Sequence, residues 1–459
     1  MTTQLTPQDL LERGLAASAA DDCTILLRHR TSANLRWANN NLTTNGEMRA
    51  VEATVVSFSG AGAASVSGAA GSLDQLVELV AAADTAAAAS SPAEDRAELV
   101  RDRVSPDWDD APEATSIGVY DAVAPALGEA FGTASAADRI LYGFVDHEVA
   151  TTYLGSTAGL RLRHVQPTGH WTVTGKSVDL TRSAWVGGAT RDFTDVDPVA
   201  FDATLAQRLA WAERSVEIPA GRYDTILPPT AVADLAIYAY WTAAARPAHE
   251  GRSVFGRRGG GTRIGETVAR QAVGLYSDPG YVGLECAPFH EADSSDDFLS
   301  VFDNGLPLDR ADWIRNGTLT ALGQTRFTAA MTDQPLTPYV DNLILDVDGA
   351  SGGVDDLVAG TERGLLLTCL WYIREVDPQT LLLTGLTRDG VYLVENGEIT
   401  GAVNNFRFNE SPVDLLNRFS HAGATVPTLS REWGDYFGRT AMPPLRVPDF
   451  NMSSVSQAR

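Results

Sequence analysis

The chain has 459 residues, of which 44% are hydrophobic, so it is long enough for two or three globular domains. Its 35 basic and 59 acidic residues give a formal net charge of −24, which repels a phosphate backbone and argues against a nucleic-acid partner. No apolar run reaches the roughly 18 residues of a membrane span, and the N-terminus lacks the order of a secretory signal. We therefore expect a cytoplasmic protein. The three cysteines, Cys23, Cys286 and Cys369, are too far apart to suggest a disulfide framework or a cysteine zinc cluster.

The first 80 residues predict a mixture of helices and strands. Thr6 to Asp9 and Ser72 to Gln75 both have the pattern of a helix N-cap, and apolar residues follow each of them at helical spacing. Between these helices, β-branched and apolar runs predict strands, and Asn45-Gly46 is the expected turn before the last of them. The strands are expected at residues 23–27, 33–38 and 50–59.

The sequence changes character twice further along. Residues 84 to about 115 are rich in Ala, Ser, Pro and acidic side chains without sustained periodicity, which predicts an exposed connection. A helix is expected from Ile117, strands follow from Ile140, and Asp197-Pro198 starts another helix. Beyond residue 216 most segments are short strands separated by Gly and Asn-Gly turns. We therefore expect one domain over residues 1–215 and a second over 216–459.

The C-terminal part contains the strongest turn signals. Asn316-Gly317, Asp389-Gly390 and Asn396-Gly397 each stand between apolar runs and supply two residues that tolerate positive φ, as two-residue hairpins require. The last two predict a meander of three strands, and Ser411-Pro412 then predicts a helix over 413–419. The expected fold class is α+β: an antiparallel sheet-and-helix domain followed by a mostly antiparallel β domain of barrel-like or meander form.

Residues 364–411, which include this meander, resemble the C-terminal signature of the TldD/PmbA family, the modulator-of-gyrase metallopeptidases. Residues 35–44, 220–235 and 301–308 resemble further segments of the family in the same order, so the resemblance covers most of the chain. It implies a role in a peptidase that degrades or processes unfolded or leader peptides. Catalytic members of the family carry a His-Glu-x-x-x-His zinc motif and a cysteine ligand near the C-terminus.

Three His-Glu pairs have to be tested as zinc sites, because such a site needs two imidazoles and a neighbouring glutamate as general base. The pairs begin at His147, His249 and His290, and none is followed by a second histidine at the required spacing. The pair His249-Glu250 occupies the family's motif position, where Val254 replaces the second imidazole. No cysteine follows Asn404. The resemblance is therefore closer to the TldE/PmbA branch, which lacks the metal motif.

This pattern favours a chain without catalytic or metal-binding residues and without a cofactor of its own. The resemblance implies a heterodimer in which a TldD-type catalytic subunit holds the zinc. Two alternatives stay open. One is a self-sufficient homodimeric metallopeptidase that uses His249, Glu250 and a distant His290 or His421. The other is a peptide-binding scaffold with no protease partner.

The glycine- and arginine-rich segment 256–265 allows two interpretations. Glycines let backbone N–H groups approach a phosphate, but the segment lacks the pattern and the strand-to-helix setting of a phosphate loop. A mobile basic loop that faces an acidic partner is the favoured interpretation.

Overall fold

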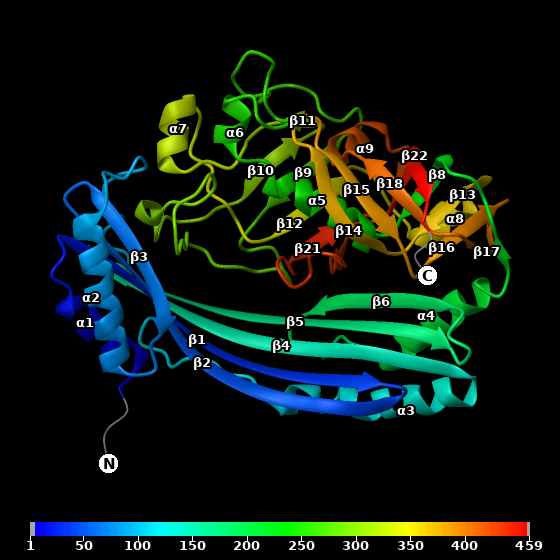
Figure 1. Ribbon diagram of the computed structural model, residues 1–459, viewed down its shortest axis with the longest axis horizontal. Helices are drawn as coiled ribbons and strands as arrows, with labels where there is room; N and C mark the ends of the chain where they lie inside the picture. The colour runs from blue at the N-terminus through cyan, green and yellow to red at the C-terminus, as the bar shows by residue number, and fades with distance from the viewer. Residues whose placement is uncertain (1–4, 457–459) are drawn as a thin grey trace.

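The computed structural model describes residues 5–456 and has the predicted α+β class (Figure 1). Its N-terminal part is one long, curved antiparallel sheet of six strands in the order β3-β2-β1-β4-β5-β6. A C-terminal part built around two further sheets lies over one face of this long sheet. The strands of the long sheet are β1 (Asp22–Ala38), β2 (Asn41–Ser59), β3 (Gly62–Ala69), β4 (Arg139–Ser156), β5 (Arg161–Ser177) and β6 (Ser183–Thr190).

Four helices cover the other face of the long sheet in two pairs. Helices α1 (Pro7–Ala17) and α2 (Leu73–Ala89) pack at one end, and α3 (Val123–Ala136) and α4 (Pro198–Trp211) pack at the other, after the short 3-10 helix η1 (Ile117–Tyr120). The predicted cap of α1 is confirmed, because Thr6 accepts a hydrogen bond from the backbone of Asp9. Apolar side chains of each pair bury one face of the sheet, which leaves the opposite face free to carry polar residues.

The turn of the first hairpin differs from the prediction. Asn45-Gly46 lies inside β2, where its residues pair with Leu35 and Asn34 of β1. The chain turns instead at Asn39 and Asn40, which have φ of 52° and 58°. Asparagine adopts this left-handed conformation more easily than most residues, so two consecutive asparagines supply the same primed turn as Asn-Gly. The expected strands at 33–38 and 50–59 are thereby parts of two longer strands.

Replacing Asn39 with alanine is expected to lower the free energy of unfolding by about 1 kcal/mol, because alanine is strained at positive φ. The substitution also removes the Asn39 side-chain oxygen, Oδ1, which accepts a hydrogen bond from the Tyr142 hydroxyl group at 2.7 Å. Asn45→Ala is the matched control, since the exposed Asn45 side chain stands on an ordinary strand position. Urea unfolding of both variants measures the difference. An equal loss in both would contradict the assignment of the turn.

The connection after α2 starts later than the sequence predicts, because α2 continues to Ala89. Residues 90–116 have no helix or strand, yet parts of them pack on the molecule. Trp108 is 9% exposed and contacts Tyr153 edge-on, with ring centroids 5.7 Å apart. Asp95 accepts hydrogen bonds from Ser295 and Ser300, so the connection also joins the two parts of the chain.

The C-terminal part has a ten-stranded and a six-stranded sheet that share a core with α5 (Pro229–Trp241). Both sheets are open among residues 5–456, so of the two forms expected for this part, barrel-like or meander, no closed barrel is present. The ten-stranded sheet contains β7 (Ser215–Val216), β8 (Gly221–Leu227), β13 (Arg363–Leu367), β14 (Leu370–Asp377), β15 (Leu382–Thr387), β16 (Val391–Glu395), β17 (Glu398–Val403), β18 (Phe406–Glu410), β19 (His421–Ala422) and β22 (Leu445–Val455). The other contains β9 (Val273–Ser277), β10 (Ala311–Arg315), β11 (Thr318–Leu319), β12 (Leu343–Val347), β20 (Val426–Thr428) and β21 (Thr440–Met442).

Short helices fill the connections of this part: α6 (Ala245–His249), α7 (Arg326–Thr332), α8 (Val354–Ala359), α9 (Pro412–Arg418) and the 3-10 helix η2 (Val301–Asp303). The predicted helix after Ser411 is thus present. Among residues 5–456, no helix has both the length and the apolar character that crossing a bilayer requires.

Two of the three hairpins predicted for the C-terminal part are confirmed. Asn316-Gly317 joins β10 to β11, and Asn396-Gly397 joins β16 to β17, with positive φ at all four residues. Asp389-Gly390 does not form a hairpin, because β15 pairs with β14 and β18 whereas β16 pairs with β13 and β17. The positive φ of these two residues instead helps the chain to cross from β15 to β16, which are distant strands of one sheet. The predicted three-strand meander is therefore wrong in its first half.

Candidate functional site

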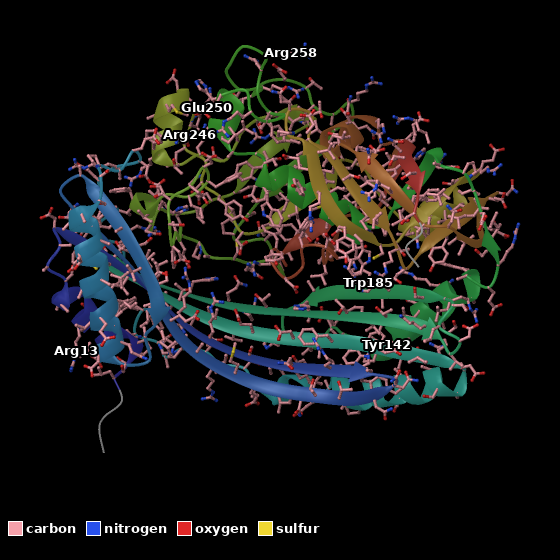
Figure 2. The ribbon with its side chains drawn as sticks, in the orientation of Figure 1. Arg13, Tyr142, Trp185, Arg246, Glu250 and Arg258 are labelled. Atoms are coloured by element: carbon pink, nitrogen blue, oxygen red, sulfur yellow. The ribbon has the colours of Figure 1, made fainter. Side chains whose placement is uncertain are left out.

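The predicted motif position lies at the end of α6, on the side of the C-terminal part that carries α7 (Figure 2). His249 is the last residue of α6, and Gly251 follows with a φ of 72° that ends the helical conformation. Val254 therefore does not continue the helix face of His249. Its side chain is 8% exposed and belongs to the main hydrophobic core.

The Glu250 carboxylate is already bound by two arginines. Arg246 donates to Oε1 at 3.3 Å, and Arg252 approaches Oε2 at 2.6 Å. Hydrogen bonds from Arg252 and Arg246 lower the pKa of Glu250, so the carboxylate stays ionised. A general base needs a pKa close to the working pH, and these two arginines move the pKa of Glu250 away from it.

The loop over residues 256–265 folds back on itself. Gly259, Gly260 and Gly261 all have positive φ, and the N–H groups of Gly260 and Gly261 bond to carbonyl groups of Arg257 and His249. These N–H groups are thus not available to a phosphate. Arg257 and Arg263 both bind Glu266, while Arg258 stands at the top of the loop in Figure 2 and makes no ion pair within residues 5–456.

The other histidines named from the sequence lie in separate places. His147 on β4 is 4% exposed and is held by Thr115 and the carbonyl group of Arg191, so it has a structural role. His421 lies on the short strand β19 and is exposed. His290 is buried in a loop that pairs with Leu306. Within the described range 5–456, no three His, Cys, Asp or Glu side chains are grouped so that they could hold a metal ion.

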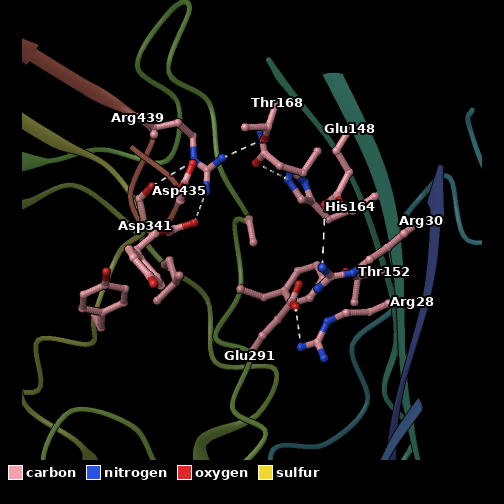
Figure 3. A pocket seen from close by; sticks show the side chains of 18 of the residues that line it. Arg28, Arg30, Glu148, Thr152, His164, Thr168, Glu291, Asp341, Asp435 and Arg439 are labelled. Atoms are coloured by element: carbon pink, nitrogen blue, oxygen red, sulfur yellow. Dashed lines mark hydrogen bonds and ion pairs between the residues drawn. The ribbon is translucent and has the colours of Figure 1, made fainter. Parts of the chain in front are cut away.

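The structure contains a larger site that the sequence analysis did not identify. A cavity of about 630 Å³ lies between the long sheet and the C-terminal part (Figure 3). Its floor consists of alternate residues on three neighbouring strands, whose other face carries the helices. β1 contributes Arg28 and Arg30, β4 contributes Asp146, Glu148, Ala150 and Thr152, and β5 contributes His164, Gln166, Thr168 and His170.

The register of the sheet places these floor residues side by side. Asp146 pairs with His170, Glu148 with Thr168 and Thr152 with His164 across β4 and β5. Arg28 pairs with Thr152 on the other side of β4. Because side chains at every second position share one face of a strand, three short alternating patterns produce one continuous polar surface.

The roof comes from loops of the C-terminal part, and four contacts cross from floor to roof. Arg28 binds Asp293 at 2.8 Å and Glu291 at 3.3 Å. Arg439, which is paired with Asp341, donates to the Thr168 hydroxyl group at 3.1 Å. His170 approaches the Asp435 carboxylate at 3.9 Å. The remaining roof residues are Ala287, Phe289, His290, Leu299, Leu308, Tyr339, Gly434, Tyr436 and Gly438.

Burial changes the acidity of several groups in the cavity. It raises the pKa of Asp146, and the nearby Asp435 raises it further, although His170 and His147 oppose the shift. Burial also raises the pKa of Glu291 despite its ion pair with Arg28, and lowers the pKa values of His164 and His290. Perturbed pKa values that cluster in one cavity are typical of functional sites.

The sequence held a signal for this cavity. Arg28 and Arg30, Asp146 and Glu148, and His164 to His170 each show polar residues at every second position. Such alternation predicts that one strand face is polar, but water is the usual neighbour of a polar face. The roof loops that replace water here are more than 100 residues away in the chain, and local patterning cannot indicate them.

Comparison with known proteins identifies the family. Residues 220–454 match the PmbA/TldA metallopeptidase C-terminal domain, which is more than half of the chain. The chain belongs to the PmbA/TldD family. No curated protein sequence matches it.

Solved structures extend the likeness in fold to almost the whole chain. TldE from Thermococcus kodakarensis is 15% identical, with a TM-score of 0.77 over 97% of this chain and 99% of its own. A protein described as a modulator of a DNA gyrase from Thermotoga maritima is 16% identical, with a TM-score of 0.77 over 97% and 100%. A corresponding protein from Bacteroides thetaiotaomicron is 13% identical, with a TM-score of 0.77 over 98% and 99%. At these identities the likeness shows a shared fold.

The family description of a PmbA/TldD metallopeptidase implies a metal ion, and the residues at the motif position do not fit one. Val254 has no donor atom and lies in the core, and the Glu250 carboxylate is occupied by two guanidinium groups. We therefore derive no catalytic step through a metal on this chain.

Proposed function

We propose that this chain is a TldE/PmbA-like, non-catalytic subunit of a two-chain peptidase. A TldD-type partner supplies the zinc and the general base, and the complex acts on unfolded or leader peptides. The observation that carries the proposal is the motif position, where two arginines hold Glu250 and Val254 replaces a possible ligand with a buried apolar side chain. The likeness in fold to a protein named TldE supports the same assignment.

A self-sufficient homodimeric metallopeptidase is a weaker candidate. It would need His249, Glu250 and either His290 or His421 to converge, and these residues belong to α6, a buried roof loop and the outer strand β19. A peptide-binding scaffold without a protease partner is the third candidate, and the polar cavity is compatible with it.

The deciding experiment measures cleavage of an unstructured peptide by the purified chain, alone and after addition of a TldD-type subunit. We expect no cleavage by the chain alone and cleavage by the mixture. Glu250→Gln in this chain should change the rate of the mixture less than twofold, because Glu250 abstracts no proton. Replacement of the motif glutamate in the partner by glutamine should abolish cleavage.

Each alternative has its own signature in the same experiment. Near-stoichiometric zinc and chelator-sensitive cleavage by the chain alone, both lost in His249→Ala, would establish a self-sufficient enzyme. Peptide binding by this chain with no cleavage in any mixture would establish a scaffold.

A further inference from the structure

The cavity between the long sheet and the C-terminal part has an excess of negative charge. Its lining contains three arginines and five carboxylates, which leaves two negative charges uncompensated when the histidines are neutral. The arginines are Arg28, Arg30 and Arg439, and the carboxylates are Asp146, Glu148, Glu291, Asp341 and Asp435.

Two of the arginines are already paired with carboxylates of the protein itself. Arg28 is bound by Glu291 and by Asp293, and Arg439 by Asp341. The third, Arg30, lies 3.8 Å from Glu148 and 3.9 Å from Glu52, which are long ion pairs, and its Nε has no hydrogen-bond partner within residues 5–456. The cavity thus keeps one incompletely satisfied guanidinium group on its floor.

Asp146 and Asp435 are the carboxylates left without a cation. Asp146 comes from β4 on the floor and Asp435 from the roof loop, and both lie near His170. No hydrogen bond to the Asp146 carboxylate occurs within the described chain, and the Asp435 side chain is 84% exposed at the edge of the cavity. Two neighbouring carboxylates with only a weakly placed imidazole between them form a site for a guanidinium or ammonium group.

A second, independent observation indicates a ligand in the same cavity. The His290 ring on the roof is 2% exposed, and its Nε2 has no partner within the described residues. The ring also bonds to the backbone of Ser300. Burial lowers the pKa of His290 although Asp303 opposes the shift, so the imidazole is neutral at pH 7, and its free Nε2 is an acceptor that an N–H group of a ligand would satisfy.

The shape of the cavity favours an extended ligand over a single ion. Asp146 and Thr152 stand six residues apart on β4, which is about 20 Å along a strand, or about six residues of an extended peptide. The floor strands β1, β4 and β5 are paired on both edges, so a ligand cannot add to them as a further strand. Recognition there depends on side chains, with Arg30, Gln166 and Thr168 facing the same space.

We propose that this cavity binds a short extended peptide segment through a basic side chain held between Asp146 and Asp435. The proposal rests on the proposed function, because it names the class of peptide that the subunit would hold for its partner. Backbone groups of the peptide then reach the Arg30 guanidinium group and His290 Nε2. Basic segments are selected over acidic ones, since the uncompensated charge of the cavity is negative.

The test uses the isolated full-length chain and two labelled nine-residue peptides, which consist of Gly and Ser with either arginine or its neutral analogue citrulline at the centre. Fluorescence anisotropy should show at least tenfold weaker binding of the citrulline peptide. Asp146→Asn and Asp435→Asn should each weaken binding of the arginine peptide five- to tenfold and leave the citrulline peptide unaffected. Asp355→Asn, at an exposed position of α8, is the matched control and should change neither.

Equal affinity for the two peptides, no binding of either, or unchanged binding by both cavity variants would overturn the proposal. The Asp435 variant keeps the test informative if Asp146→Asn fails to fold, because the Asp435 side chain is exposed. No partner subunit is present in this measurement. A negative result here therefore contradicts the peptide site, whereas a negative result in the cleavage experiment contradicts the two-chain peptidase.

Discussion

Replacing Asp234 with asparagine is expected to remove a large part of the pH dependence of stability. Asp234 lies on α5, and its side chain is 0% exposed. Its Oδ1 accepts hydrogen bonds from Ser430 and from the backbone of Glu432, while its Oδ2 has no partner within residues 5–456. Burial raises the pKa of this carboxyl from 3.8 to about 7, although both hydrogen bonds lower it. Burial in an apolar core disfavours the ionised form more than the two donors favour it.

The sign of the effect follows from proton binding. Between about pH 4 and pH 7 the folded state holds the Asp234 proton and the unfolded state does not, so the free energy of unfolding falls as the pH rises through this range. A shift of about three pKa units corresponds to about 4 kcal/mol. Asparagine cannot ionise, so the stability of Asp234→Asn relative to the parent should increase by about this amount from pH 4 to pH 8.

Urea unfolding of parent and variant at several pH values gives this difference directly. The comparison is needed because Glu291, Glu432 and Asp146 also have raised pKa values and contribute to both curves. The free energy of unfolding of Asp355→Asn, a substitution at an exposed position, should change with pH as that of the parent does. Parallel curves for Asp234→Asn and the parent would show that Asp234 is ionised in the folded protein at pH 5.

Arg28→Met is expected to lower the free energy of unfolding by about 3 kcal/mol, because it leaves the Glu291 carboxylate largely buried and without its cation. Arg28 and Glu291 have side chains 15% and 18% exposed, and their ion pair joins the long sheet to the roof of the cavity. Asp293, the second partner of Arg28, has a side chain that is 51% exposed, so water can solvate its carboxylate once the arginine is gone. The loss of this second ion pair therefore contributes less to the destabilisation.

A double variant separates the buried charge from lost packing. Arg28→Met with Glu291→Leu removes both charges and should recover at least half of the stability lost in Arg28→Met. Urea unfolding at pH 7 measures four chains: the parent, Arg28→Met, Glu291→Leu and the double variant. The loss in Arg28→Met should shrink at pH 4, where Glu291 takes up a proton. A double variant as unstable as the sum of its single variants would contradict the pairing of these residues.

Local signals in the sequence predicted the local features well. The cap at Thr6, the hairpins at Asn316-Gly317 and Asn396-Gly397, and the helix after Ser411 all depend on a few adjacent residues, and all are present. The backbone preferences of asparagine, glycine and proline act within one turn, whatever surrounds them.

Predictions failed where distant segments decide the outcome. Asp389-Gly390 has hairpin chemistry, but β8, β13, β18 and β22 lie between the two strands that it connects. Gly390 also packs so closely on Thr368 that an added Cβ would lie 1.9 Å from its hydroxyl oxygen. The absence of the second histidine from the zinc motif was visible in the sequence, whereas the two arginines that bind Glu250 became evident only from the fold.

The alternating floor of the cavity restricts how the length of the chain can vary. Side chains on β4 change faces at every residue, so inserting or deleting one residue between Asp146 and Thr152 would reverse the faces on one side of that point. Either Asp146 and Glu148 would then point toward the helices, or Val149 and Thr151 would point toward the cavity. Carboxylates would then meet the apolar core of α3 and α4. Related proteins that keep this cavity should therefore differ by substitution in β4 and β5, and carry insertions and deletions in the loops of the roof.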